Sequence, residues 1–138
     1  MSAESPIPMS NLEFNFDSIK EECDFSITSE RNVENARQLR FDFKNGVEVN
    51  VRILLNDETG SDIVITNITT LEASGNNDVT RKGYGSKVIS AIIEWGRSQN
   101  LHEIRASQVS DRIKEFWLKN GFTEILGANV TKDYIYYL

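Results

Sequence analysis

Residues 80–87 read Thr-Arg-Lys-Gly-Tyr-Gly-Ser-Lys, and an apolar stripe follows them at once: Val88, Ile89, Ile92 and Ile93. This spacing is typical of one buried helix face, so we expect a helix from Gly83 to about Asn100. Glycines at its start let the backbone approach a ligand closely. Unpaired amides at a helix start carry partial positive charge, and Arg81 and Lys82 add full charges beside them. The stretch therefore predicts a site for the phosphates of a small molecule.

Alternating apolar and polar residues before this helix predict a run of strands. Three successive antiparallel strands are expected at Leu39–Phe43, Val47–Leu55 and Ile63–Leu71, with a hairpin turn at Asn45-Gly46. The pattern further upstream is less regular. There we expect a strand over Leu12–Phe16, a short strand over Cys23–Ile27 and a helical turn within Asn32–Gln38.

The chain after the helix continues as strand, helix and a final strand pair. The expected elements are a strand over Glu103–Val109, a helix over Arg112–Asn120 capped by Ser110 or Asp111 and stopped by Gly121, and strands over Phe122–Leu126 and Tyr134–Leu138. This order predicts an α+β fold, with helices flanking a mixed, mostly antiparallel sheet. Residues 1–10 hold both prolines and are expected to form a flexible tail, and residues 11–138 a single domain.

Composition narrows the classes of partner. The chain has 138 residues and a net charge of −6, which argues against nucleic-acid and anionic-membrane partners and favours cationic ones. Its single cysteine, Cys23, excludes an internal disulfide. We found no signal-peptide pattern, no apolar run of about 20 residues and no metal-ligand spacing. A cytoplasmic protein without a metal is therefore expected.

Three phosphate-binding motifs compete for the two glycines. A nucleotide P-loop requires Gly-Lys-Ser/Thr, whereas Gly85 is followed by Ser86-Lys87. A dinucleotide fingerprint requires a third glycine where Val88 stands. The stretch from Thr80 to Ser86 instead resembles the pyrophosphate loop of the GNAT superfamily of N-acetyltransferases, whose motif is Gln/Arg-x-x-Gly-x-Gly/Ala.

A second stretch lies where that superfamily would have it. Residues 113–122, Ile-Lys-Glu-Phe-Trp-Leu-Lys-Asn-Gly-Phe, resemble the late helix of the family, which ends in Gly-Phe. The resemblance covers about residues 63–138, and the first half of the chain lacks the two early helices that relatives usually carry. The expected fold is thus GNAT-like with a reduced N-terminal half.

The resemblance implies acetyl-CoA as cosubstrate. It implies that backbone amides from Arg81 to Ser86, with Lys82, Gly83, Tyr84 and Gly85 between them, hold the pyrophosphate. It also implies that Leu71 to Ala73, at the end of a strand that splays from its neighbour, pair with the pantetheine arm. Phe116 and the helix after Ser110 would line the other side of the arm.

The chain departs from the family pattern in three places. Thr80 stands at the Gln/Arg position, the loop over residues 72–80 is longer than usual, and Trp117 stands where many relatives have the tyrosine that protonates the leaving thiolate. An indole N–H only donates a hydrogen bond, so Trp117 is interpreted mainly as a packing residue.

A free amine must lose a proton before it attacks, so a base is expected. Glu72 is the first candidate, because it follows the strand that should flank the thioester, although an exposed loop carboxylate is an equal alternative. Glu48 and Glu58 are weaker candidates. His102 is interpreted as structural or exposed, and the tyrosines at 134, 136 and 137 mainly as packing residues.

Two classes of function remain open, besides a purely structural glycine turn. The first is an N-acetyltransferase that acts on an amine of a small molecule or peptide by direct attack in a ternary complex. The second is a non-catalytic CoA-binding or regulatory module on the same fold, favoured by Trp117 and the short first half. The sequence leaves the oligomeric state open, and an exposed strand edge at Asp133–Leu138 is one candidate contact for a homodimer.

Overall fold

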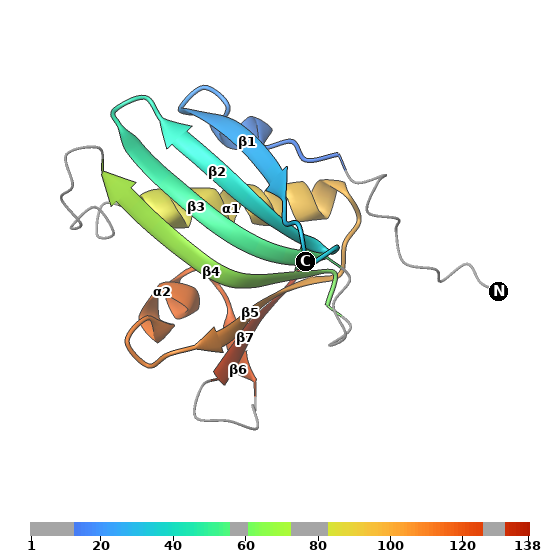
Figure 1. Cartoon of the computed structure of the whole chain (residues 1–138). Helices are drawn as coiled ribbons and strands as arrows, with labels where there is room; N and C mark the ends of the chain where they lie inside the picture. Colours follow the sequence, from blue (N-terminus) through green and yellow to red (C-terminus); the bar gives the residue numbers. More distant parts are fainter. Residues whose placement is uncertain (1–12, 56–60, 73–82, 126–131) are drawn as a thin grey trace.

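The computed structural model describes residues 13–55, 61–72, 83–125 and 132–138. Its centre is one seven-stranded sheet with the order β1-β2-β3-β4-β5-β7-β6 (Figure 1). Neighbouring strands are antiparallel except β4 and β5, which are parallel. The strands are β1 (Cys23–Ser29), β2 (Ala36–Phe43), β3 (Val47–Leu55), β4 (Ile63–Glu72), β5 (Glu103–Val109), β6 (Thr123–Ile125) and β7 (Lys132–Tyr137). The predicted α+β class is confirmed.

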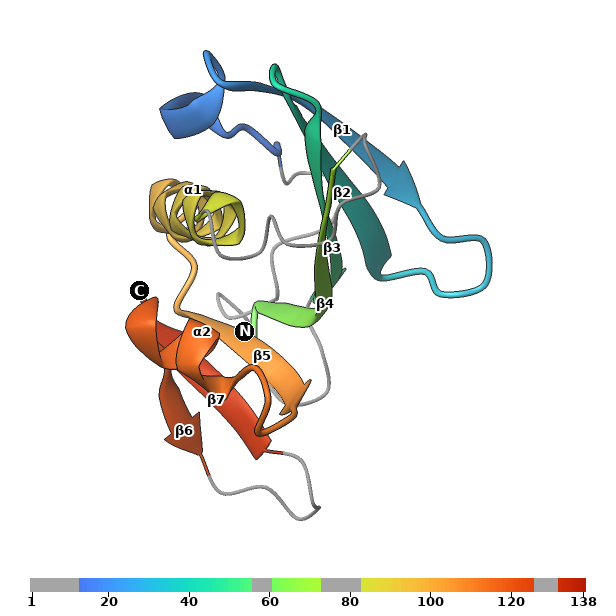
Figure 2. The same cartoon turned by 90° about the vertical axis from the view of Figure 1, so that its left-hand side faces the viewer.

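In the described part of the chain, two α-helices accompany the sheet. Helix α1 (Tyr84–Ser98) crosses one face of β1 to β4, whereas α2 (Lys114–Lys119) lies at the β5-β7-β6 end (Figure 2). The predicted apolar stripe of α1 is buried against the sheet and includes Val88, Ile89, Ile92 and Ile93. Among the described residues, no helix separates β1 from β2, in line with the expected reduced N-terminal half.

The β2–β3 hairpin forms as its sequence predicts. Residues of β3 alternate between buried and half-buried along the whole strand, because every second side chain faces α1. Gly46 adopts a φ of 87° and donates its N–H to the Phe43 carbonyl at 3.0 Å. The strand series β2, β3 and β4 is antiparallel, as expected.

The predictions upstream of β2 were partly wrong. Cys23 begins β1 as predicted, but residues 13–16 form no strand and lead into a short 3-10 helix, η2 (Asp17–Ile19). The alternating aromatics there serve packing instead: Phe14 stacks on Trp95, with ring centroids 4.6 Å apart. The predicted helical turn at 32–38 is replaced from Ala36 onward by β2, because pairing with β3 outweighs weak local helix preference.

Helix α2 is shorter than predicted and has a different start. It follows a turn in which Ile113 donates its N–H to the Ser110 carbonyl at 3.1 Å, and no side chain caps it, so the expected cap by Ser110 or Asp111 was wrong. The turn uses the backbone of Ser110 where a cap would use its side chain. Gly121, with a φ of 91°, ends the helix as predicted.

Strand β7 is not a sheet edge. It lies between β5 and β6, and Tyr134 pairs with Ala106 on one side and Glu124 on the other. The prediction of an exposed strand edge over Asp133–Leu138 is therefore wrong, because β6 pairs with Asp133, Tyr134 and Ile135, while the homodimer itself stays a prediction. Within the described residues, the helices are too short or too polar to cross a membrane.

Candidate functional site

A cleft opens where the parallel strands β4 and β5 part. Their pairing covers three positions only and ends at Ile65 and Ala106, after which the strands diverge with α2 near the gap (Figure 1). A cavity of about 140 Å³ lies there. Its lining consists of Ile65, Thr66, Asn67, Ile68, Ser107, Gln108, Val109, Ser110, Ile113 and Trp117. We call this cavity the β4–β5 cleft.

Irregularities in both strands explain the divergence. In β4 the register shifts between residues that pair with Arg52 and Ile53, so Thr66 is an extra residue. In β5 the register shifts beyond Ala106, where Gln108 adopts a φ of 54°. Such bulges bend strands and end their pairing. Backbone groups of β4 beyond Ile65 are thus released from the ladder with β5.

A short chain of polar contacts holds the β4 bulge. Arg52 Nη1 donates a hydrogen bond to Thr66 Oγ1 at 3.1 Å, and Arg52 Nε forms an ion pair with Glu30 Oε2 at 2.6 Å. Gln38 donates to the same carboxylate at 2.8 Å. The hydrogen bond from Arg52 holds the pKa of Glu30 below its usual value. The residue that starts β4's divergence is therefore tied to the loop after β1.

The predicted pyrophosphate loop lies partly outside the described residues, which leave out Thr80, Arg81 and Lys82. Gly83 is the residue before α1; its φ of 85° is left-handed, and no atom of the described residues lies within 4 Å of a Cβ built on it. Within the described part of the chain, no side chain caps the start of the helix. The left-handed backbone at Gly83 therefore favours glycine, and the described residues leave space in front of the first turn of α1.

Gly85 lies in the first turn of α1, close to α2. It is buried, and a Cβ built on it would lie 3.1 Å from Phe116 Cε1 and 3.8 Å from Ile68 Cδ1. The absence of a side chain at Gly85 makes room for Phe116 of α2 and Ile68 of β4, and its part in pyrophosphate binding stays a prediction. Because Ile68 lines the β4–β5 cleft, the first turn of α1 adjoins the cleft wall.

The next side chains of α1 connect neighbouring elements. Ser86 Oγ accepts a hydrogen bond from Asn120 Nδ2 at 3.1 Å, and Asn120 also donates to the Phe116 carbonyl. The Tyr84 hydroxyl accepts a hydrogen bond from Asn45, and its ring meets Phe43 edge-on. Both predicted cofactor residues therefore brace the start of α1 through their side chains, which leaves their backbone amides for binding.

The end of β4, which the sequence analysis predicted to pair with the pantetheine arm, lies beyond the β4–β5 cleft. Leu71 is 47% exposed and pairs with Glu48, while the backbone of Glu72 pairs with Val47. The cleft ends at Ile68, so Glu72 follows it by roughly 13 Å along the strand. The strands thus part earlier than expected. Ala73 and the Glu72 side chain lie outside what the structure describes.

The other titratable residues considered in the sequence analysis do not line the β4–β5 cleft, as far as the structure describes them. Glu48 pairs with Arg40 at 2.8 Å on the face of the sheet opposite α1 and accepts a hydrogen bond from Asn50. His102 is 90% exposed and precedes β5, whereas the cleft lies at its other end. Glu58 lies outside the described residues. Tyr134 is buried, its hydroxyl donates to Glu124, and burial raises its pKa.

The predicted residues of α2 and its preceding turn lie at the cleft or behind it. Ser110 lines the cleft, and Phe116 is half-buried against Gly85. Trp117 lines the cleft as well, with its ring edge-on to Phe116 and to Phe122. Only 3% of Trp117 is exposed, and its Nε1 has no hydrogen-bond partner among the described residues.

The sequence analysis predicted Ser110 but missed the other polar residues that line the cleft: Thr66, Asn67, Ser107 and Gln108. Thr66 stands in a β-branched run that reads as ordinary strand, and the left-handed backbone of Gln108 leaves no mark in a single sequence. Both follow from strand register, which joins segments far apart in the chain. Among the described residues, the cleft lining contains no titratable side chain.

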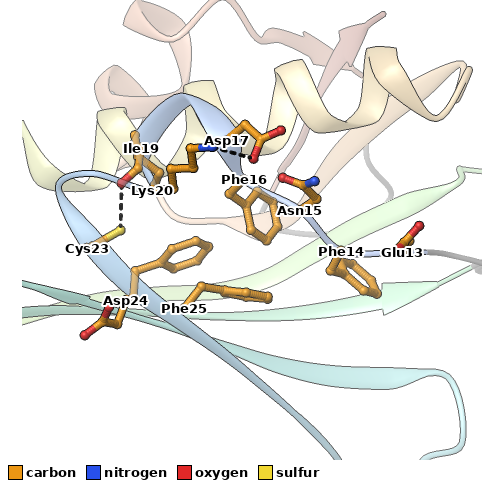
Figure 3. Close-up of a pocket in the computed structure, with 11 residues that line it drawn as sticks. Glu13, Phe14, Asn15, Phe16, Asp17, Ile19, Lys20, Cys23, Asp24 and Phe25 are labelled. Atoms are coloured by element: carbon orange, nitrogen blue, oxygen red, sulfur yellow. Dashed lines mark hydrogen bonds and ion pairs between the residues drawn. The ribbon is translucent and has the colours of Figure 1, made fainter.

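A second hollow of about 380 Å³ lies between the Glu13–Lys20 segment and β1 (Figure 3). Aromatic rings form much of its wall, and Cys23 donates its thiol to the Ile19 carbonyl. Burial raises the pKa of this thiol, which fits a packing role. Because β1 is three strands from β4, about 14 Å across the sheet, this hollow is separate from the cleft.

Comparisons with known proteins support the fold. No protein-family model matches the chain, and no curated protein matches it. A solved structure does: an acetyltransferase of the GNAT family from Listeria monocytogenes 4b F2365, with a TM-score of 0.51 and 12% identity. The match covers 77% of this chain and 66% of that one, just under two thirds of its length. The chain therefore has a GNAT-like fold.

Proposed function

We propose that this protein is an acetyl-CoA-dependent N-acetyltransferase that acts on an amine of a small molecule or peptide. One observation carries the proposal: the first turn of α1 lies beside the β4–β5 cleft, because a Cβ built on Gly85 would lie 3.8 Å from Cδ1 of Ile68, a residue of the cleft lining. The proposed phosphate site at the start of α1 therefore lies next to the β4–β5 cleft, which would take the pantetheine arm. Bound there, acetyl-CoA supplies an activated acetyl group as its thioester.

The described residues fit such a ligand in three respects. The left-handed Gly83 leaves open space before α1, where backbone amides attract phosphate. The released backbone of β4 beyond Ile65 offers hydrogen bonds to the amides of a pantetheine arm. Trp117 forms part of the cleft wall, and among the described residues its buried Nε1 has no hydrogen-bond partner. Arg81 and Lys82 remain proposed phosphate contacts, and Leu71 and Ala73 proposed contacts of the arm.

Glu72 remains the proposed base for the amine. The amine must be neutral to attack, and proton removal by a positioned carboxylate is a common solution. Its distance along β4 from the cleft means that the amine would approach from the far end of β4 or pass its proton through water. Catalysis otherwise rests on holding the two substrates together.

A non-catalytic CoA-binding module is the second candidate. The cleft lining favours it, because none of its described residues is titratable. A module of this kind would bind acetyl-CoA at the same place without turnover.

Calorimetric titration with acetyl-CoA tests the shared part of both candidates. We would compare the wild-type chain with Gly83→Asp and Gly83→Asn, which have nearly the same shape and differ by one charge. Both residues tolerate a left-handed backbone, and an acidic side chain at a helix start stabilises the helix. Micromolar binding is expected in the wild type, about tenfold or more weaker in Gly83→Asp than in Gly83→Asn.

The outcomes separate the candidates. If Gly83→Asp and Gly83→Asn bind acetyl-CoA with equal affinity, the phosphates do not bind at the start of α1. If the wild type gives no heat of binding, the proposal that the protein binds acetyl-CoA is wrong. Binding followed by release of free CoA with a panel of polyamines, aminoglycosides and lysine peptides supports the transferase. Binding without turnover across that panel supports the module.

A further inference from the structure

Strand β1 (Cys23–Ser29) is an edge of the sheet and runs along the rim of the ribbon (Figure 2). It pairs with β2 over all seven of its residues without a register shift, whereas the opposite edge, β6, has three residues. Proteins usually keep edge strands from pairing with other chains by shortness, a bulge, a proline or a lysine. Strand β1 has none of these features, so its edge can accept a further strand.

The hydrogen bonds to β2 identify the backbone groups of β1 that point outward. Lys44 donates its N–H to the Glu22 carbonyl at 3.3 Å, and from there every second residue of β1 is bonded to β2: Asp24, Ser26 and Thr28. The N–H and C=O groups of the residues between them face away from β2: Cys23, Phe25, Ile27 and Ser29. Within the described segments, no turn, loop or helix makes a backbone hydrogen bond to these groups.

A second copy of the chain fits this edge because β1 is complementary to itself. A twofold axis through Ser26 pairs every residue of β1 with β1 of the partner and sets the outward groups of Phe25 opposite those of the partner's Ile27. The Ile27 side chain, which is 37% exposed, then lies beside the half-buried Phe25 ring of the other copy. An axis one residue away pairs only residues 23–27 or 25–29.

The charges favour the same register. Asp24 lies opposite the partner's Thr28, and the two Asp24 residues are about 13 Å apart along the ladder. An axis at Phe25 would halve that distance, and an axis at Ile27 would place Asp24 opposite the partner's Glu30. Just outside the paired strands, Glu22 approaches the partner's Glu30, but each of these carboxylates has an ion pair within its own chain.

We infer that the protein forms a symmetric homodimer in which the β1 strands of two copies pair antiparallel about Ser26. This inference goes beyond the proposed function and does not depend on it. Strand β1 lies three strands from β4, so the pairing extends the sheet on the side away from the β4–β5 cleft of each copy. An extended peptide of another protein is the alternative occupant of this edge.

Disulfide cross-linking tests the register. Because Ser26 is bonded to β2, it forms a non-hydrogen-bonded pair with its counterpart, with Cα atoms about 4.5 Å apart, which a disulfide can bridge. We expect Ser26→Cys to give a covalent dimer under mild oxidation, and Thr28→Cys, whose counterpart would lie about 13 Å away, to give none. Both side chains are exposed, so neither change should affect folding. The wild type controls for the buried native thiol of Cys23.

Sedimentation velocity of the full chain measures the association itself. We expect a micromolar dissociation constant for the wild type, and one about tenfold or more higher for Ile27→Lys, which places a charge beside the partner's Phe25. Leu118→Lys, at a 43% exposed leucine of α2, should leave it unchanged.

Three results would overturn the inference. They are a wild type that stays monomeric at about 100 μM, equal dissociation constants for Ile27→Lys and Leu118→Lys, and equal cross-linking of Ser26→Cys and Thr28→Cys. A monomeric wild type would leave the edge to a peptide of another protein. Failure of acetyl-CoA to bind would overturn the proposed function and leave this dimer intact.

Discussion

Gly85 of α1 lies directly against the ring of Phe116 in α2, at a distance that leaves no room for a side chain. A Cβ on Gly85 would lie 3.1 Å from Phe116 Cε1 and 3.3 Å from Cζ. The two helices therefore meet through a glycine, next to Trp117, which packs against Phe116 and lines the β4–β5 cleft.

Gly85→Ala is expected to destabilise the protein by about 1 kcal/mol. Alanine is a better helix former than glycine by about 1 kcal/mol, but overpacking against a ring costs about 1–3 kcal/mol. Urea unfolding measures the difference. In a Phe116→Leu background the clash is relieved, so the same change should become neutral or stabilising. An equal effect in both backgrounds would contradict the contact.

In Glu30→Gln, the free energy of unfolding is expected to fall less steeply than in the wild type as the pH drops from 6 to 3. The pKa of Glu30 is lowered in the folded chain, chiefly by the hydrogen bond from Arg52, so the unfolded state binds the proton more readily. The stabilisation is present above the unfolded pKa of about 4.3 and is lost as the pH falls through the lower folded value. Unfolding midpoints from pH 6 to pH 3 test this.

The control for that change is Glu34→Gln, at an exposed carboxylate of the same loop. Glu34→Gln should leave the pH dependence of the free energy of unfolding between pH 6 and pH 3 nearly as in the wild type. Since Arg52 also holds the bulge at Thr66, Glu30→Gln should weaken acetyl-CoA binding modestly as well. If the free energy of unfolding depends on pH in the same way in Glu30→Gln and Glu34→Gln, the Glu30–Arg52 ion pair does not form in solution.

Glu72→Gln is expected to reduce kcat/KM about 10²- to 10⁴-fold once an amine acceptor is found, because general-base catalysis contributes on that scale. Acetyl-CoA affinity should be unchanged, since the substitution keeps size and polarity. Glu94→Gln, on the exposed side of α1, is the matched control. Full activity of Glu72→Gln would transfer the role of base to water or to another group.

Phe16→Ala is expected to cost about 3 kcal/mol of unfolding free energy, the lower range for removing a buried ring. Phe16 is 6% exposed and contacts the rings of Phe25 and Phe41 edge-on, at 4.7 and 5.2 Å. Tyr137→Ala, at a 68% exposed ring, should stay within about 0.5 kcal/mol of the wild type. A small loss for Phe16→Ala would mean that the segment before β1 does not cover the core.

Predictions from the sequence succeeded where neighbours in the chain decide the structure. The stripe of α1, the Asn45-Gly46 hairpin and the stop at Gly121 each depend on residues a few positions apart. Predictions upstream of β2 failed where distant contacts prevail. Phe14 and Phe16 alternate like strand residues, yet the partners of their rings, Trp95 and Phe41, come from α1 and β2.

The sequence by itself therefore determined the α+β class, the order of most elements and the glycine-bearing start of α1, since propensity and periodicity are local properties. Tertiary structure alone decided that β4 and β5 part at Ile65 rather than near Leu71, and that Gly85 faces Phe116. It also decided that the Trp117 N–H is buried without a partner among the described residues. These features depend on strand register and helix packing, which bring together segments that are tens of residues apart in the chain.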